Sequence, residues 1–453
     1  MKKLKIAFTA ALVVMLHSYE ASAQRSGAAL DTLKELPAVL PDRKDSFIER
    51  ADAGEQPSGF AIRGIKGLAW TPDQYLKEIP VLANYKMNFM MNCYLSFFTR
   101  PKGAEYEWKT WDHLKNEWWL PLTPQVKTDY EKIFKAAKAN KIDFCFSIHP
   151  QLASARPANL RSEEDFKILA SHYLWAQSKG VEWFSVTIDD ITITDGSDHT
   201  TYGEDQALYV NKLLALLRKK NKKVKMIFCP THYAGLGKDP KEKAYLETIA
   251  KVLDKDVYVF WTGPQVTSPF ITSEDARTFK DLVQHKLILW DNFPVNDNIT
   301  STAHLGPLNG RAKDLHTVID GFMSNPMGLQ SEINRIPMFT IADYAYNPTA
   351  YDPKSSIGQA ILHQTDDKAK QQVLYELTKL YTGRIDVGFN PVVFQFDNIT
   401  KSAFSEYLAK AYLTNFRKIK SEFEQAFPKD YKGMKITLGQ TSNILDDIYK
   451  NNY

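Results

Sequence analysis

Cysteine is scarce in this chain, with three residues among 453: Cys93, Cys145 and Cys229. An odd number leaves at least one thiol unpaired, and none of the three stands in a CxxC pair, so a structural zinc site is not expected. All three lie in apolar runs typical of strands. We therefore expect them to be buried as small hydrophobic residues.

Neither sign of charge is in marked excess, because 57 Lys and Arg face 53 Asp and Glu, a net charge of +4. Nucleic-acid binding depends on clustered positive charge, so this balance gives no support to a nucleic-acid partner. Long apolar runs are also missing. The run at the N-terminus, Ile6–Leu16, is too short to cross a bilayer, and no membrane span is expected.

The N-terminus has the three parts of a secretory signal peptide. Three lysines within the first five residues precede Ile6–Leu16, and Ala21–Ala23 has the A-x-A pattern of a cleavage site. We expect residues 1–23 to be removed and Gln24 to begin the mature chain. The style of the signal is bacterial, so the protein is expected to be secreted or periplasmic. Residues 24–55 are polar and are expected to form an N-terminal extension.

Short apolar runs alternate with amphipathic segments through most of the chain. Eight runs are predicted to be strands: Gly59–Gly64, Met87–Tyr94, Ile142–Ile148, Trp183–Ile188, Val224–Cys229, Val257–Trp261, Leu287–Trp290 and Val318–Met323. Helical segments between the runs indicate parallel strands with crossover helices.

Eight such units fit a (β/α)8 TIM barrel, which we place at residues 56–365. A doubly wound open sheet is the alternative, but no GxGxxG follows the first run. Beyond the barrel the strands stop. Residues 366–453 are predicted to form a C-terminal helical region.

Two adjacent carboxylates, Asp189 and Asp190, end the fourth predicted strand. In a barrel of this type, catalytic groups come from the C-terminal ends of the strands. Neighbouring carboxylates couple, so that one has its pKa raised and can act as an acid near neutral pH while the other stays ionised. The alternative is a structural role in helix capping or loop hydrogen bonding.

The next four predicted strands end in aromatic, amide and carboxylate residues. These ends are Cys229–Tyr233, Trp261–Pro264, Trp290–Asp297 and Ser324–Met327. Aromatic faces cover sugar rings, and amides and carboxylates hydrogen-bond to hydroxyls. The composition of this barrel end is therefore that of a sugar pocket.

These stretches, together with Ile188–Ile191 and Leu305–Pro307, resemble glycoside hydrolase family 84, the β-N-acetylglucosaminidases that include O-GlcNAcases. The resemblance covers about residues 58–350, in the family's order and spacing. It implies a barrel fold and a substrate-assisted retaining hydrolysis, in which the acetamido oxygen of the substrate attacks the anomeric carbon. It implies no metal or other cofactor. The implied partner is a glycan or glycoconjugate with a terminal N-acetylhexosamine.

The resemblance also implies roles for individual residues. Asp189 would orient and polarise the acetamido N–H, Asp190 would be the general acid and then the general base, and Tyr233 would donate to the acetamido oxygen. The sugar contacts that it implies are the Gly64 carbonyl, Trp290 and Asn292 around the acetamido group, Asp297 at the O4 and O6 hydroxyls, and Asn325 at the far side of the ring.

The chain departs from the family near the first three strand ends. Leu95 stands where the family has a lysine that binds the O3 hydroxyl, and our hypothesis is that Lys66 takes over this contact. The alternative is a solvated lysine at the rim. For His149 we favour a core histidine over a substrate contact. Trp118 and Trp119, in an aromatic insertion after the second strand, are expected to pack against the barrel.

Three functions remain open at this stage. The first is a retaining exo-β-N-acetylhexosaminidase. The second is a hydrolase of the same mechanism for a different or O3-substituted 2-acetamido sugar, because the family lysine is missing. The third is a glycan-binding barrel without catalysis, against which the intact Asp189–Asp190 pair argues. The sequence does not predict an oligomeric state.

Overall fold

The computed structural model describes residues 36–37, 40–94, 116–193, 197–297, 301–330, 332–382 and 390–453. The predicted signal peptide, residues 24–35 and 38–39 of the predicted N-terminal extension, and Leu95 lie outside the described residues. Among the helices that are described, none is both long and apolar enough to cross a membrane.

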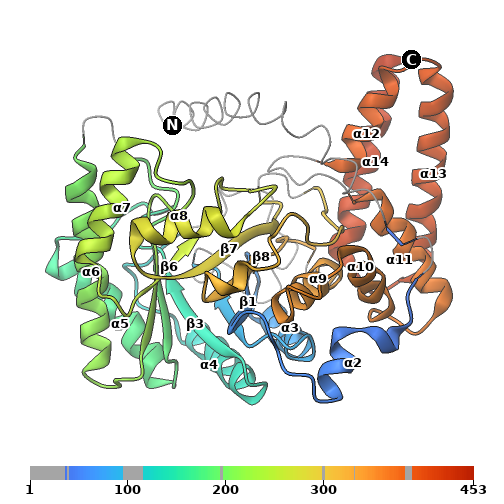
Figure 1. Ribbon diagram of the computed structural model, residues 1–453. Coiled ribbons are helices and arrows are strands. Elements are labelled where there is room, and N and C mark those ends of the chain that lie inside the picture. Colours follow the sequence, from blue (N-terminus) through green and yellow to red (C-terminus); the bar gives the residue numbers. More distant parts are fainter. Residues whose placement is uncertain are drawn as a thin grey trace.

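Eight parallel strands form a closed barrel in which every strand pairs with its neighbours in the chain and β8 closes onto β1 (Figure 1). The strands are β1 (Ile62–Gly67), β2 (Phe89–Asn92), β3 (Asp143–Ile148), β4 (Trp183–Thr187), β5 (Lys225–Cys229), β6 (Tyr258–Trp261), β7 (Lys286–Pro294) and β8 (Gly321–Asn325). The predicted (β/α)8 barrel is confirmed.

Alternation along each strand fills two hydrophobic clusters. In β5, Met226 and Phe228 join the cluster between the barrel and the helices, whereas Ile227 and Cys229 belong to the cluster inside the barrel. Cys93 and Cys145 lie in the same inner cluster, and all three cysteines are free and buried. The expectation that they act as small hydrophobic residues is confirmed.

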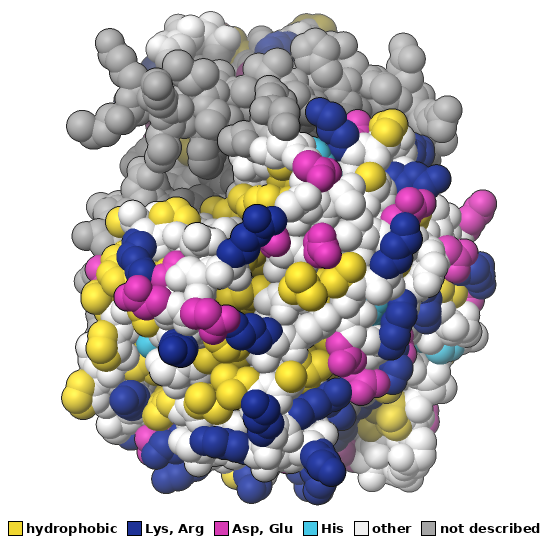
Figure 2. Space-filling view, turned by 90° about the vertical axis from the view of Figure 1, so that its left-hand side faces the viewer, with side chains coloured by type: hydrophobic (Ala, Val, Ile, Leu, Met, Phe, Trp, Pro, Cys, Tyr) yellow, Lys and Arg dark blue, Asp and Glu magenta, His cyan; other side chains and the backbone are white. Residues whose placement is uncertain are grey.

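Helices surround the barrel: α3 (Pro72–Asn84), α4 (Pro124–Ala139), α5 (Glu163–Ser178), α6 (His199–Arg218), α7 (Pro240–Val252), α8 (Ser273–Val283) and α9 (Arg335–Tyr346). Ser, Thr or Asp caps the first six, and at α3 Thr71 and Gln74 form a reciprocal capping box. Figure 2 shows the face over α5, α6 and α7, where side chains of both charge signs are interspersed. The helix starts follow the C-terminal ends of the strands and frame the candidate site.

The first strand lies three residues further along the chain than predicted. Ser58 and Gly59 donate their backbone N–H groups to the carbonyl of Tyr346 in α9, and Phe60 donates to Ala345, so this segment pairs with a helix end rather than with a strand. The ladder starts at Ile62 instead. Lys66, predicted to follow the strand, is consequently part of it.

The C-terminal region consists of helices that pack beside the barrel, at the right of Figure 1. They are α10 (Pro353–Leu362), α11 (Lys368–Leu380), α12 (Pro391–Thr400), α13 (Ser405–Ala426) and α14 (Lys432–Asn452). At the N-terminal side a 3-10 turn (Arg43–Asp45) and α2 (Phe47–Asp52) precede the barrel. A C-terminal helical region is confirmed, and α10 lies before its predicted start at residue 366.

Candidate active site

Asp189 follows β4 and is buried, with 4% of its surface exposed. The Tyr94 hydroxyl, at the end of β2, donates to Oδ2 of Asp189 over 2.5 Å. The other oxygen, Oδ1, is also buried and has no hydrogen-bond partner among the described residues. A buried acceptor that lacks a partner is costly, so Oδ1 is available for an N–H or O–H donor of a ligand.

His149 supports Asp189 from the end of β3. Its Nε2 lies 2.8 Å from the backbone oxygen of Asp189, and its Nδ1 accepts the N–H groups of Gln151 and Leu152 over 3.1 Å and 3.0 Å. Two amide donors at Nδ1 fix the tautomer with the proton on Nε2. Burial lowers the pKa of His149 to about 4, so the ring is neutral. The favoured interpretation of His149 as a core histidine is confirmed.

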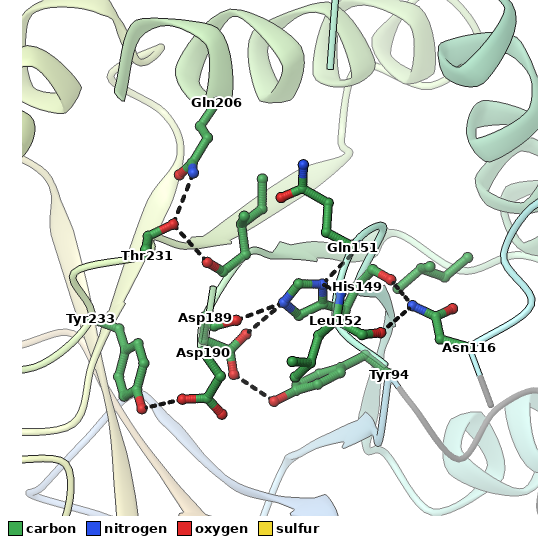
Figure 3. A network of polar contacts seen from close by, with 12 residues as sticks. Tyr94, Asn116, His149, Gln151, Leu152, Asp189, Asp190, Gln206, Thr231 and Tyr233 are labelled. Carbon is green, nitrogen blue, oxygen red and sulfur yellow. Dashed lines mark hydrogen bonds and ion pairs between the residues drawn. The ribbon is translucent and has the colours of Figure 1, made fainter. Parts of the chain in front are cut away.

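Asp190 points away from Asp189 because its backbone is left-handed, with φ at 56°. This conformation is uncommon for a residue with a side chain, and it concentrates at functional sites. The Asp190 side chain is exposed at the open side of the pair, where the Tyr233 hydroxyl donates to Oδ1 over 2.7 Å. In Figure 3, Tyr94 and Tyr233 reach the two carboxylates from opposite sides.

The two carboxylates differ in their electrostatic surroundings. Desolvation raises the pKa of Asp189, and the Tyr94 hydrogen bond and the charge of Lys66 oppose that rise. Desolvation raises the pKa of Asp190 too, and the negative charge of Asp189 raises it further. Because Asp189 repels a second negative charge next to it, Asp190 is the member of the pair that holds a proton more readily.

Lys66 is buried near the end of β1 rather than at a solvated rim. Only 2% of its surface is exposed, and its amine is 4.9 Å from the ring centre of Tyr94 and 4.6 Å from that of Trp290. These are cation–π distances. The amine makes no hydrogen bond or ion pair with any residue that the structure describes. The alternative of an exposed lysine is therefore wrong.

The predicted sugar-contact residues of β7 and β8 come together. Asn292 donates to the carbonyl of Val266 over 2.7 Å, and Asn325 donates to Oδ1 of Asn292 over 2.9 Å. The buried Trp290 Nε1 and Asn325 Oδ1 have no hydrogen-bond partner within the described parts of the chain. An unpaired donor and an unpaired acceptor are thus held in β7 and β8, whose C-terminal ends lie at the same end of the barrel as the carboxylate pair.

A bulge near the end of β7 sets the direction of the side chains that follow Trp290. The β7–β8 register shifts between Asp291 and Pro294, and β7 continues four residues beyond its predicted end at Trp290. Bulges re-aim side chains next to active sites. Asp297, three residues after β7, is partly buried at the same barrel end.

Gly64 is not at a strand end, contrary to prediction. It lies in the interior of β1, paired with Phe89 and Met323, and three residues before the strand ends at Gly67. A Cβ atom at Gly64 would lie 2.1 Å from the carbonyl oxygen of Phe89. The close approach of β2 therefore accounts for a glycine at this position, and the contact between its carbonyl and a sugar stays a prediction.

Sequence reasoning missed Tyr94, which was placed in the second strand without a role. The signal was present, because Tyr94 comes two residues after the end of β2 and therefore emerges at the same barrel end as Asp189. Asn116 was missed too. It donates to the carbonyls of His149 and Leu152 and holds the turn that supports His149.

Trp118 is fully buried, and its Nε1 donates to the Arg156 carbonyl over 2.7 Å. Trp119 is partly buried and packs against the same hydrophobic cluster. Both therefore pack against the barrel as expected, rather than presenting free faces to a sugar.

A separate cavity of about 480 Å³ lies at the opposite end of the barrel, among residues such as Asn88, Asp143, Trp183 and Lys225. Asp143 and Lys225 begin strands β3 and β5, so this cavity faces away from the carboxylate pair. Catalytic groups of such barrels come from the C-terminal strand ends, which sets the candidate site at Asp189 and Asp190. No cluster of three or more potential metal ligands occurs among the described residues.

A (β/α)8 barrel with two carboxylates in different electrostatic surroundings and amide side chains at the C-terminal strand ends has the construction of a glycoside hydrolase. Residues 61–379 match the family model NAGidase, beta-N-acetylglucosaminidase. Because the match spans most of the chain, the protein belongs to this beta-N-acetylglucosaminidase family.

Individual relatives agree with this assignment. Protein O-GlcNAcase of Rattus norvegicus is 25% identical over 332 residues, 70% of this chain and 34% of that protein. The Mus musculus protein O-GlcNAcase is 25% identical over 311 residues, 66% of this chain and 33% of that protein. The chain thus spans about a third of the length of these mammalian relatives.

Solved structures show the same architecture. The structure of CpGH84B superimposes with a TM-score of 0.64 at 26% identity, over 88% of this chain and 68% of that one. A mutant of the O-GlcNAc hydrolase of Thermobaculum terrenum superimposes with a TM-score of 0.63 at 21% identity, over 86% and 85% of the two chains. The second likeness concerns the fold alone.

Proposed function

We propose that the protein is a retaining exo-β-N-acetylhexosaminidase that uses the acetamido group of its substrate as the nucleophile. The observation that carries the proposal is the pair Asp189–Asp190, one carboxylate buried with an unpartnered oxygen and the other exposed beside Tyr233. An enzyme nucleophile and an acid would both need to reach the glycosidic bond. Here only Asp190 is exposed to an incoming substrate. Asp189 is buried, so it is placed to accept a hydrogen bond from the substrate and not to attack the anomeric carbon.

In the first step, the acetamido carbonyl oxygen attacks the anomeric carbon and forms a C1–O bond. The glycosidic C1–O bond breaks, and Asp190 gives its proton to the departing oxygen. The amide nitrogen gains positive charge as the oxazoline ring closes. Asp189, through Oδ1, accepts the acetamido N–H and stabilises that charge as a carboxylate.

In the second step, Asp190 accepts a proton from water, and the water oxygen attacks C1 while the oxazoline C1–O bond breaks. The amide re-forms, and the product keeps the β configuration because two displacements have taken place. Tyr233 leaves Asp190 to donate to the acetamido oxygen. The unpaired Nε1–H of Trp290 donates to the substrate, and the unpaired Oδ1 of Asn325 accepts from it.

The remaining assignments belong to the same proposal. Asp297 and Asn292 contact the sugar, the substrate is a glycan or glycoconjugate with a terminal N-acetylhexosamine, and the enzyme acts after export to the periplasm or beyond the cell. A mature protein that begins at Gln24 would support export, and a retained N-terminus would count against it.

The proposal predicts hydrolysis of 4-nitrophenyl N-acetyl-β-D-glucosaminide and no measurable hydrolysis of the matching β-D-glucoside, which has a hydroxyl in place of the acetamido group. The rate of nitrophenol release measures both. Equal rates on the two sugars would contradict the proposal, since the acetamido group would then have no part in the chemistry. An O3-substituted 2-acetamido sugar serves as a third substrate, and a preference for it would identify a substituted sugar as the natural ligand.

A further inference from the structure

The proposed reaction needs two neighbouring carboxylates in opposite charge states. Asp189 must be anionic while Asp190 is protonated, yet both sit where desolvation favours the neutral acid. If Asp189 took up a proton, it could not accept the acetamido N–H. Some feature of the pocket has to keep the charge on Asp189.

Tyr94 hydrogen-bonds to Asp189, and Lys66 lies over the ring of Tyr94. The Lys66 amine lies over the ring of Tyr94 at 4.9 Å, and the hydroxyl of that ring donates to Asp189 over 2.5 Å. A cation on the ring face makes the phenol a stronger hydrogen-bond donor. Trp290 covers the amine at 4.6 Å from its ring centre and shields it from solvent.

The other titratable groups around Asp189 carry no positive charge. Desolvation lowers the pKa of His149 to about 4 and raises the pKa values of Tyr94, Tyr233 and Cys229, so these side chains are neutral near pH 7. The remaining titratable groups near Asp189 are Cys93 and Asp190, and neither side chain can carry a positive charge. Among the described residues facing the pair, Lys66 alone supplies a cation.

We infer that Lys66, acting through and beside Tyr94, is a positioning residue that keeps Asp189 ionised and thereby leaves the catalytic proton on Asp190. The inference rests on the proposed function and gives Lys66 a role other than a contact with the sugar O3 hydroxyl. Electrostatic support of this kind acts on the ionisation of the pair and not on substrate affinity alone.

The pH dependence of kcat/KM shows in which direction the loss of Lys66 should act. Activity requires Asp189 without its proton, so the acid limb of the kcat/KM profile reports the pKa of Asp189, and the basic limb reports Asp190. Removing a nearby positive charge raises the pKa of a carboxyl. Lys66→Met should therefore move the acid limb upward by about one pH unit, and the basic limb by less. Tyr94→Phe should move the acid limb in the same direction.

Lys225 offers a matched control. Its amine stands 4.6 Å from the ring centre of Trp183, in the same kind of contact, but at the start of β5 and at the other end of the barrel. Lys225→Met should leave the pH profile as in the wild type, and Lys66→Arg, which keeps the charge, should restore the acid limb. If Lys66→Met does not fold, Lys66→Gln carries the same comparison.

The profiles are measured on 4-nitrophenyl N-acetyl-β-D-glucosaminide. An acid limb in Lys66→Met that coincides with that of Lys225→Met, with only KM changed, would overturn the inference and mark Lys66 as a sugar contact. A wild-type enzyme without activity on any 2-acetamido sugar would remove the proposed function, and this inference with it. If the wild-type enzyme shows a bell-shaped kcat/KM profile and the acid limb of Lys66→Met does not move, only the inference about Lys66 is overturned and the proposed function stands.

Discussion

Replacing Asp190 with Asn is expected to lower kcat/KM on an alkyl N-acetyl-β-D-glucosaminide by about 10³-fold, because general acid–base catalysis contributes roughly 10²–10⁴. An alkoxide is a poor leaving group and needs the proton that Asp190 supplies. The Asn side chain keeps the size of the residue and can still accept from Tyr233, which now donates to Asp190 over 2.7 Å. The loss should therefore come from chemistry and not from unfolding.

Substrates with different leaving groups show whether Asp190 acts as the general acid or in another role. A 2,4-dinitrophenyl glycoside leaves without protonation, so Asp190→Asn should retain much more of its bond-breaking rate on that substrate. Asp189→Asn is the matched control, since it should lose activity on both substrates to a similar degree. A loss in Asp190→Asn that is independent of the leaving group, measured by single-turnover kinetics, would show that Asp190 is not the acid.

The second large effect is expected beneath the pocket, where Arg311 holds Asp291 in β7. Two hydrogen bonds of 2.7 Å and 2.6 Å join them, and both side chains are almost fully buried. Asp291 stands between Trp290 and Asn292 in the chain, so this pair fixes the strand that carries two predicted pocket residues. Arg311→Met leaves a buried carboxylate without its partner and is expected to lower the free energy of unfolding by about 3–5 kcal/mol.

Urea unfolding measures this change, and an exposed pair provides the comparison. Arg161 also bonds Asp205 through its side chain, over 2.8 Å, but its side chain is 66% exposed. Exposed ion pairs contribute little, so Arg161→Met should scarcely move the transition. A cost for Arg311→Met no greater than that for Arg161→Met would mean that the buried pair does not secure β7.

The sequence allowed most of the barrel to be predicted because each strand is buried on both faces. Such strands are continuous apolar runs, and β4 is an instance in which the run ends directly at Asp189. The first strand was misplaced for a long-range reason. The backbone donors of Gly59 and Phe60 bond carbonyls in α9, nearly 290 residues away, and no local pattern contains that pairing.

The carboxylate pair was predictable, but its surroundings were not. Adjacent aspartates after an apolar run are a local signal. The depth of Lys66 depends on where β1 starts, and its neighbours Tyr94 and Trp290 come from other strands. The tautomer of His149 likewise depends on backbone N–H groups of its own turn, which only the folded loop defines. The contacts on which the proposed role of Lys66 rests are therefore ones that local sequence patterns do not contain.

The measurement that tests the central claim most directly is the effect of fluorine on the acetamido group. Each fluorine in the series from N-acetyl to N-trifluoroacetyl withdraws electrons from the carbonyl oxygen and makes it a weaker nucleophile, while the leaving group stays the same. With the acetamido oxygen as the nucleophile and Asp189 accepting the acetamido N–H, kcat/KM on the 4-nitrophenyl glycosides should fall steeply and monotonically along the series. A flat series with active enzyme would contradict the account, because a group of the protein would then be attacking the anomeric carbon.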